Sequence, residues 1–233
     1  MSGPTAYDVV DRYDDAYFDD LASRYRRRNR FARQRISNVF SLLPSLRAAR
    51  VLDLGCGMGT FTIEAARAGA HAIGVDPMPA ALAAARRVAE AANVVGARFV
   101  RADAAHLPIA DRCTDIALAA DFTEHLDNDT LARVLDEARR VLRSGGTLVI
   151  YTPERSHLFE RLREHGILLR QDPSHIGVRT DVALVDAVQR AGFRDIRVVH
   201  LPSHLPGWNL LERAFASRVA LLRRRVGLTA RAP

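Results

Sequence analysis

The chain has 233 residues and no lysine, so all 34 of its basic residues are arginine. A P-loop that cradles phosphates needs a Gly-Lys-Ser/Thr sequence, and the absence of lysine excludes it. The only two cysteines, Cys56 and Cys113, provide neither a disulfide framework nor a zinc signature. No apolar run is long enough to span a bilayer, and residues 1–20 are too acidic and polar for a secretory signal. These absences favour a globular protein of the reducing cytoplasm.

The formal net charge is +7, and a dense run of arginines lies within residues 24–35. A basic run of this kind can contact nucleic-acid phosphates. Several aspartates precede it closely, however, and few aromatic residues accompany it at a spacing suited to base stacking. We therefore interpret the run as a solvated helix face with acid–base pairs nearby, and keep RNA binding as an alternative.

Residues 51–60, with the sequence VLDLGCGMGT, are the most informative segment of the chain. An apolar strand interrupted by Asp53 leads into three alternate glycines and then a helix over 61–68. Glycines permit a sharp turn and a close approach of ligand to backbone, and the N–H groups that open the helix favour an anion. The turn predicts a nucleotide-like cofactor. It lacks the G-x-G-x-x-G spacing of dinucleotide sites, because Thr62 stands where the third glycine would be.

The next strand, residues 71–75, ends at Asp76, whose carboxylate can accept hydrogen bonds from both ribose hydroxyls of a nucleoside. The pattern D-x-G-x-G-x-G followed by this acid resembles the class I S-adenosylmethionine (SAM)-dependent methyltransferases. Three later segments continue the resemblance in the family's order: residues 99–104, 115–126 and 141–150. The similarity covers residues from about 47 to 200.

Strands and helices alternate at short spacing between residues 50 and 151, which requires parallel strands with helices on both faces. We expect an α/β, doubly wound, mostly parallel sheet of seven strands. Residues 226–231 would be its last, antiparallel strand, beside strands five and six. Residues 1–46 are expected to form a helical lid, and 47–233 a methyltransferase domain with an acceptor-side insertion at about 152–180. An amphipathic helix is predicted over 208–222.

The resemblance implies a set of cofactor contacts at the carboxyl ends of the strands. Asp53 and the glycine turn would face the methionine part of SAM, Asp76 would hold the ribose, and the remaining residues would surround the adenine or line the site. The predicted contacts are Asp53, Gly55, Cys56, Gly57, Gly59, Asp76, Pro77, Met78, Asp103, Ala104 and Ala120. For Asp76 the alternative is a helix N-cap ahead of Pro77.

The reaction implied is methyl transfer to a small molecule, most plausibly to a hydroxyl group. A hydroxyl acceptor needs a base, and His125, after the fourth strand, and His175, on the insertion, are the candidates. Our primary expectation is a site without metal. Asp121, Glu124 and His125 could instead converge on a divalent cation such as Mg²⁺, a pattern similar to that of the ubiquinone-biosynthesis O-methyltransferases.

Two other functions stay open. One is an RNA methyltransferase that uses the 24–35 arginine run, and the other is a non-catalytic SAM-binding domain. The acceptor and the oligomeric state are not predicted, because fold and cofactor motifs do not determine them.

Overall fold

The computed structural model describes residues 18, 20, 22, 23, 25, 27, 29–167, 172–203, 205 and 207–233. The first part of the predicted 1–46 lid lies outside the described residues, and the lid remains a prediction. No helix in the described part of the chain is both long and apolar enough to cross a membrane.

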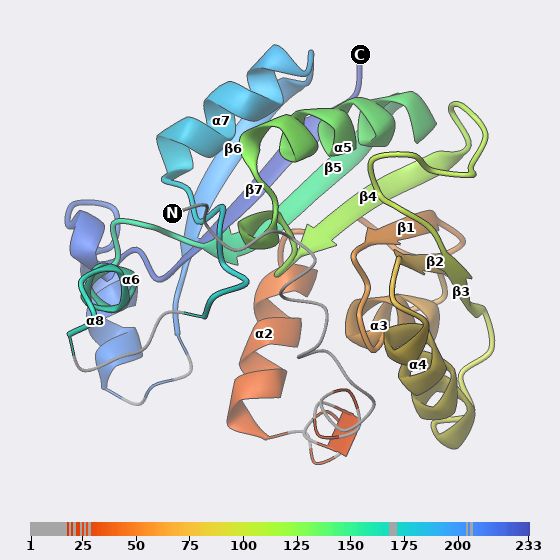
Figure 1. The fold of residues 1–233 in the computed structure, drawn as a ribbon, viewed down its shortest axis with the longest axis horizontal. Coiled ribbons are helices and arrows are strands. Elements are labelled where there is room, and N and C mark those ends of the chain that lie inside the picture. Colours follow the sequence, from red (N-terminus) through yellow and green to blue (C-terminus); the bar gives the residue numbers. More distant parts are fainter. Residues whose placement is uncertain are drawn as a thin grey trace, which may run out of the picture.

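Seven strands form a single sheet in the order β3-β2-β1-β4-β5-β7-β6 (Figure 1). The strands are β1 (Arg50–Leu54), β2 (His71–Asp76), β3 (Ala97–Arg101), β4 (Thr114–Ala120), β5 (Leu142–Pro153), β6 (Arg194–Leu201) and β7 (Arg225–Arg231). The first four and β5 pair in parallel, whereas β7 lies antiparallel between β5 and β6. The predicted fold class is thereby confirmed.

The helices are α2 (Arg30–Phe40), α3 (Thr60–Arg67), α4 (Pro79–Ala91), α5 (Asn128–Val141), α6 (Leu158–Glu164), α7 (Asp181–Arg190) and α8 (Trp208–Phe215). Side chains define their ends in several cases. Asp127 accepts a hydrogen bond from the Thr130 N–H at the start of α5, and Thr180 caps α7 in the same way. Such caps satisfy N–H groups that a helix leaves unpaired at its first turn.

Both faces of the sheet are buried, as expected when helices cover a parallel sheet on each side. Alternate residues of one strand enter different cores: Leu52 and Leu54 of β1 pack with α5 and α7, whereas Val51 packs with α2 and α3. The period of two that governs strands therefore divides each strand between two apolar layers.

The chain reverses its direction of winding between β1 and β4, since β1 pairs with β2 on one side and β4 on the other. Ligands of such sheets bind beyond the carboxyl ends of the strands at this point. In Figure 1, α2 lies below the tips of β4 and β5, with α6 and α8 to one side and α3 and α4 to the other. The candidate site therefore lies among these helices.

The tail differs from the sequence prediction. The helix expected over 208–222 ends at Phe215, and only a 3₁₀ turn, Ala220–Leu222, follows it. Buried Glu212 ties α8 to the loop after β6, because its carboxylate accepts a hydrogen bond from the Ser203 N–H. The segment packs on the domain rather than continuing outward.

Candidate active site

The three alternate glycines form the turn between β1 and α3. Gly55, Gly57 and Gly59 have φ angles of 64°, 51° and 79°, values that glycine adopts without the steric cost of a Cβ. A Cβ added at Gly57 would meet no atom within 4 Å. Cys56, between these glycines, is buried and donates its N–H to the Val75 carbonyl at 2.9 Å. The outer side of the turn is therefore open to a ligand.

Asp53 lies beneath this turn and is almost fully buried. Its Oδ2 accepts hydrogen bonds from the Thr62 N–H at 3.0 Å and from the Thr62 hydroxyl at 2.6 Å. Burial raises the pKa of Asp53 to about 7, against the opposing effect of the two Thr62 bonds. The carboxyl group thus fixes α3 to β1, and its contact with a cofactor remains a prediction.

Asp76 connects the glycine turn to the segment before α4. Its Oδ2 accepts the Gly57 N–H and its Oδ1 accepts the Met78 N–H, both at 2.9 Å. Each carboxylate oxygen has two lone pairs, so each can accept one more bond. The alternative that Asp76 is the helix N-cap is wrong, because Met78 occupies that position. Burial raises the pKa of Asp76, and the two backbone bonds oppose the rise.

The other predicted cofactor residues also lie at the carboxyl ends of β2, β3 and β4. Pro77 is exposed and Met78 partly buried, whereas Ala104 and Ala120 are buried. The Asp103 carboxylate is exposed, and its Oδ1 accepts the Ala105 N–H at 2.9 Å. Since β3, β2, β1 and β4 are neighbours in the sheet, these residues lie side by side along its carboxyl-terminal edge.

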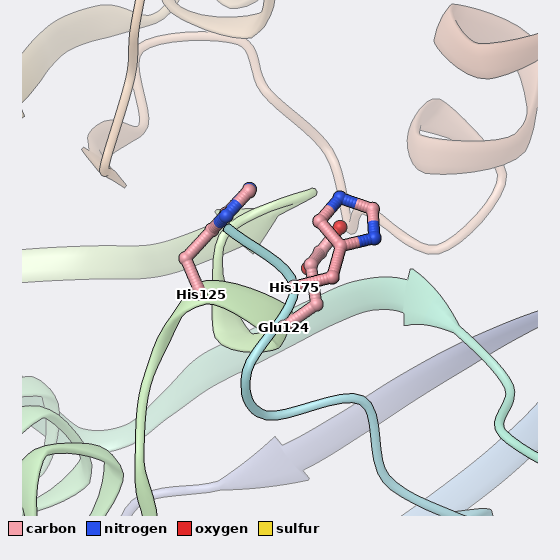
Figure 2. Close-up of side chains that lie close together, drawn as sticks. All are labelled: Glu124, His125 and His175. Carbon is pink, nitrogen blue, oxygen red and sulfur yellow. The ribbon is translucent and has the colours of Figure 1, made fainter. Parts of the chain in front are cut away.

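The two candidate bases meet beside the end of β4. His125 ends the 3₁₀ turn Thr123–His125, and His175 comes from the insertion; their ring centroids are 5.0 Å apart in a T-shaped arrangement (Figure 2). The Nδ1 of His125 lies 3.1 Å from the Ser174 carbonyl oxygen. A carbonyl can only accept, so Nδ1 carries the proton and Nε2 is left to accept one. Burial and the neighbouring His125 lower the pKa of His175.

The insertion is held to the turn after β4 by contacts with backbone atoms. The Gly177 N–H donates to the Glu124 carbonyl at 2.8 Å, and the Arg179 guanidinium donates to the Thr123 and Leu126 carbonyls at 3.0 and 2.8 Å. A Cβ on Gly177 would lie 1.9 Å from the Leu126 oxygen. Only glycine allows this approach, which brings His175 to His125.

Asp121, the first residue after β4, is engaged by two arginines. Arg35 Nε and Arg225 Nη1 each donate to its carboxylate at 2.7 Å. Burial alone would raise the pKa of Asp121, but the two guanidinium groups hold it below its usual range. The interpretation of the 24–35 run as a solvated face is thus wrong at Arg35, which reaches into the site. Arg24, Arg26 and Arg28 lie outside the described residues.

A possible metal-binding group also lies here, although its members differ from the predicted set. One ligand atom each of Glu124, His125 and His175 lie within 4.8 Å of one another. Asp121 is not part of the group, because its carboxylate is bound by the two arginines, and His175 takes its place. Burial and then the Asp121 carboxylate raise the pKa of Glu124 to about 7. Two imidazoles and one carboxylate suit a transition metal better than Mg²⁺.

Sequence reasoning missed two residues of the site. Arg225 reaches Asp121 across 104 positions of sequence, and no local pattern signals that pairing. Phe122 covers Gly55 so closely that an added Cβ there would lie 2.1 Å from the ring. An aromatic residue two positions after the fourth strand is the only signal that could have pointed to it.

Comparison with known proteins agrees with this arrangement. Residues 51–146 match a family model described as a methyltransferase domain. The match extends from β1 to the first residues of β5 and includes the glycine turn, Asp76 and the turn after β4. An uncharacterized methyltransferase of Mycobacteroides abscessus is 36% identical over 106 residues, which are 46% of this chain and 40% of that protein. A ubiquinone biosynthesis O-methyltransferase of Rhodopseudomonas palustris is 31% identical over 125 residues, 49% and 44% of the two chains.

The fold of the chain is shared with solved structures. A SAM-dependent methyltransferase of Thermotoga maritima, described as a possible histamine N-methyltransferase, aligns with a TM-score of 0.71 over 95% of this chain and 99% of that one, at 20% identity. The chain spans less than half the length of the two curated relatives above. SAM is the cofactor that this family implies, and the open glycine turn and the remaining acceptor capacity of Asp76 fit it.

Proposed function

We propose that this chain transfers the methyl group of SAM to a hydroxyl group of a small-molecule acceptor. The observation that carries the proposal is the His125–His175 pair at the end of β4, with the Nε2 of His125 available to accept a proton. Asp76 would bind the cofactor ribose. His125 is close enough to Asp76 to lower the pKa of its carboxyl group. Base and cofactor residues thus belong to one site.

Bound SAM would supply an electrophilic methyl group on its sulfonium. Asp76 would accept bonds from the ribose hydroxyls, Asp103 and Ala104 would lie along the adenine edge, and the glycine turn would let the cofactor approach the backbone. A neutral hydroxyl is a poor nucleophile, so the His125 Nε2 would take its proton as the oxygen attacks. A positioned base of this kind contributes about 10²–10⁴-fold to a rate.

Support for an oxygen acceptor also comes from the relatives, since the Rhodopseudomonas palustris protein is named as an O-methyltransferase. A second candidate is metal-assisted transfer, which the grouping of Glu124, His125 and His175 favours. In that case the imidazole nitrogens would be ligands, and a cation would lower the pKa of the bound hydroxyl. Full turnover after treatment with a strong chelator would contradict this candidate.

RNA methylation has narrower support. Of the arginine run, Arg35 is held by Asp121, and its donors are thus partly used within the protein. RNA binding would show a steep loss of affinity between low and physiological salt. A non-catalytic domain would bind SAM yet transfer no methyl group to any acceptor.

The proposed function is tested first through the cofactor. Calorimetric titration with S-adenosylhomocysteine should give binding to the wild type and at least about tenfold weaker binding to Asp76→Ala, which loses charge-assisted hydrogen bonds. Asp186→Ala, on the exposed side of α7, should bind like the wild type. Absence of binding to the wild type would refute the proposal. Binding without methyl transfer to phenols, catechols, sugars or carboxylates would refute the acceptor class.

A further inference from the structure

A small pocket between α2, β5 and β7 is lined by hydrogen-bond donors. It has a volume of about 20 Å³, and Arg35, Arg224, Arg225 and Tyr151 are among the residues around it. Within the described part of the chain, no carboxylate lines it. A space of this size holds one small polar group.

The charges around this pocket do not balance. Arg35 and Arg225 share the carboxylate of Asp121. One element further on, Arg163 and Arg224 share the carboxylate of Glu160, with their Nη1 atoms 2.6 and 2.8 Å from its Oε1. Four guanidinium groups are thus neutralised by two carboxylates.

Neighbouring groups do not remove this excess. Besides Asp121 and Glu160, the carboxyl group that acts on Arg225 is Glu124, and even with Glu124 ionised, three carboxylates would face four guanidinium groups. At least one guanidinium group is therefore left without a carboxylate partner. Its surroundings are mostly buried, since the Arg224 and Arg225 side chains are only 14% and 13% exposed. A desolvated charge without a partner is costly.

Tyr151 adds a further donor. Its hydroxyl oxygen accepts a bond from the Asn38 amide at 3.2 Å, and no described residue accepts the Tyr151 proton. The Arg225 guanidinium lies over the Tyr151 ring, 5.3 Å from its centroid. The pocket thus combines a surplus of positive charge with an uncommitted O–H, which together suit an oxyanion.

The pocket lies at the same edge of the sheet as the glycine turn. Asp121 directly follows β4, and the Arg35 guanidinium also lies 5.3 Å from the ring centroid of Phe61 in α3, the helix after the turn. An anionic group held here would belong to a molecule that extends toward the cofactor residues.

We propose that the acceptor carries a carboxylate, and that Arg35, Arg224 and Arg225 bind it in this pocket. The inference rests on the proposed function, since it concerns the acceptor of that reaction. A carboxylate matches the planar fork of a guanidinium, and its single negative charge suits the positive charge left uncompensated beside this pocket.

Titration calorimetry with benzoate, its neutral analogue benzamide, and phenyl phosphate tests the inference. Each titration is carried out with and without S-adenosylhomocysteine. The variants are Arg35→Gln and Arg224→Gln, each of which leaves the shared carboxylate with its second arginine. The matched control is Arg50→Gln, at the opposite end of the sheet, where Asp115 keeps Arg143 in the same way.

Benzoate should bind equally well to the wild type and to Arg50→Gln, and more tightly than benzamide. Its binding to Arg35→Gln and Arg224→Gln should be at least about tenfold weaker. Equal binding of benzoate and benzamide, or an equal loss in the control, would overturn the inference. Tighter binding of phenyl phosphate would overturn the choice of a carboxylate. If the wild type binds S-adenosylhomocysteine but not benzoate, this inference alone is refuted. If the wild type does not bind S-adenosylhomocysteine, the proposed function is refuted.

Discussion

At the scale of single residues, His125 owes its tautomer to the Ser174 carbonyl, an atom of the insertion. We predict that His125→Ala lowers kcat by about 10²–10⁴-fold and changes the affinity for S-adenosylhomocysteine far less, because Asp76 keeps its hydrogen bonds to the Gly57 and Met78 N–H groups. His165→Ala serves as control, because the His165 ring is exposed and its Nδ1 lies 2.8 Å from the Arg161 carbonyl oxygen. Steady-state kinetics and calorimetry measure both effects. A normal kcat in His125→Ala would transfer the base function to another group.

Glu124 makes stability depend on pH. Its pKa is raised from 4.5 to about 7 in the folded protein, so between these values the folded state holds a proton that the unfolded state releases. The free energy of unfolding therefore falls as pH rises through this window. We expect urea denaturation to show a slope that Glu124→Gln reduces and that Glu90→Gln, on the exposed face of α4, does not. If the free energy of unfolding of the wild type rose with pH relative to that of Glu124→Gln, the prediction would be contradicted.

At the scale of elements, the insertion depends on the close approach of Gly177 to Leu126. Gly177→Ala should displace the insertion and separate the two histidines, with a loss of kcat and a destabilisation of about 1–3 kcal/mol, as for an overpacked site. Gly166→Ala is the control, because its added Cβ meets no atom within 4 Å; its φ of 65° disfavours alanine, a strain that Gly177 does not share, so a cost at Gly166 reports backbone strain without a steric clash. Steady-state kinetics measures the loss of kcat, and urea denaturation measures the loss of free energy of unfolding. Wild-type kcat in Gly177→Ala would show that the insertion does not position His175.

The elements differ in how far the sequence predicted them. The central strands followed from apolar runs and the glycine turn. The tail helix was overextended because the apolar periodicity continues after Phe215, whereas the chain there turns to reach β7. Periodicity records which face is apolar, and not where tertiary contacts end a helix.

At the scale of the whole molecule, Asp121 connects α2, β4 and β7 through Arg35 and Arg225. Asp121→Ala would leave two guanidinium groups without their carboxylate, and we expect a loss of about 3 kcal/mol in the free energy of unfolding. Asp115→Ala removes a carboxylate shared by two much more exposed arginines and should cost less than about 1 kcal/mol. Equal losses in urea denaturation would refute the distinction.

The same connection marks the limit of prediction from sequence for the site. The residues at the carboxyl ends of β1 to β4 follow local motifs, and their positions were predictable. Arg35 and Arg225 lie 86 and 104 positions from Asp121, so their pairing depends on the path of the whole chain. The grouped residues differ from the alternative metal-binding set for this reason: the arginines occupy Asp121, and the insertion supplies His175 instead.

The attachment of the insertion has a consequence for engineering and for divergence among homologues. Gly177 and Arg179 bind carbonyl groups of the opposing turn, and His125 binds the carbonyl of Ser174. Peptide groups exist whatever the side chains are. Randomising positions 173, 176 and 178 while keeping His175, Gly177 and Arg179 would therefore yield a library in which the loop still docks, and substrate preference could be selected without rebuilding the scaffold.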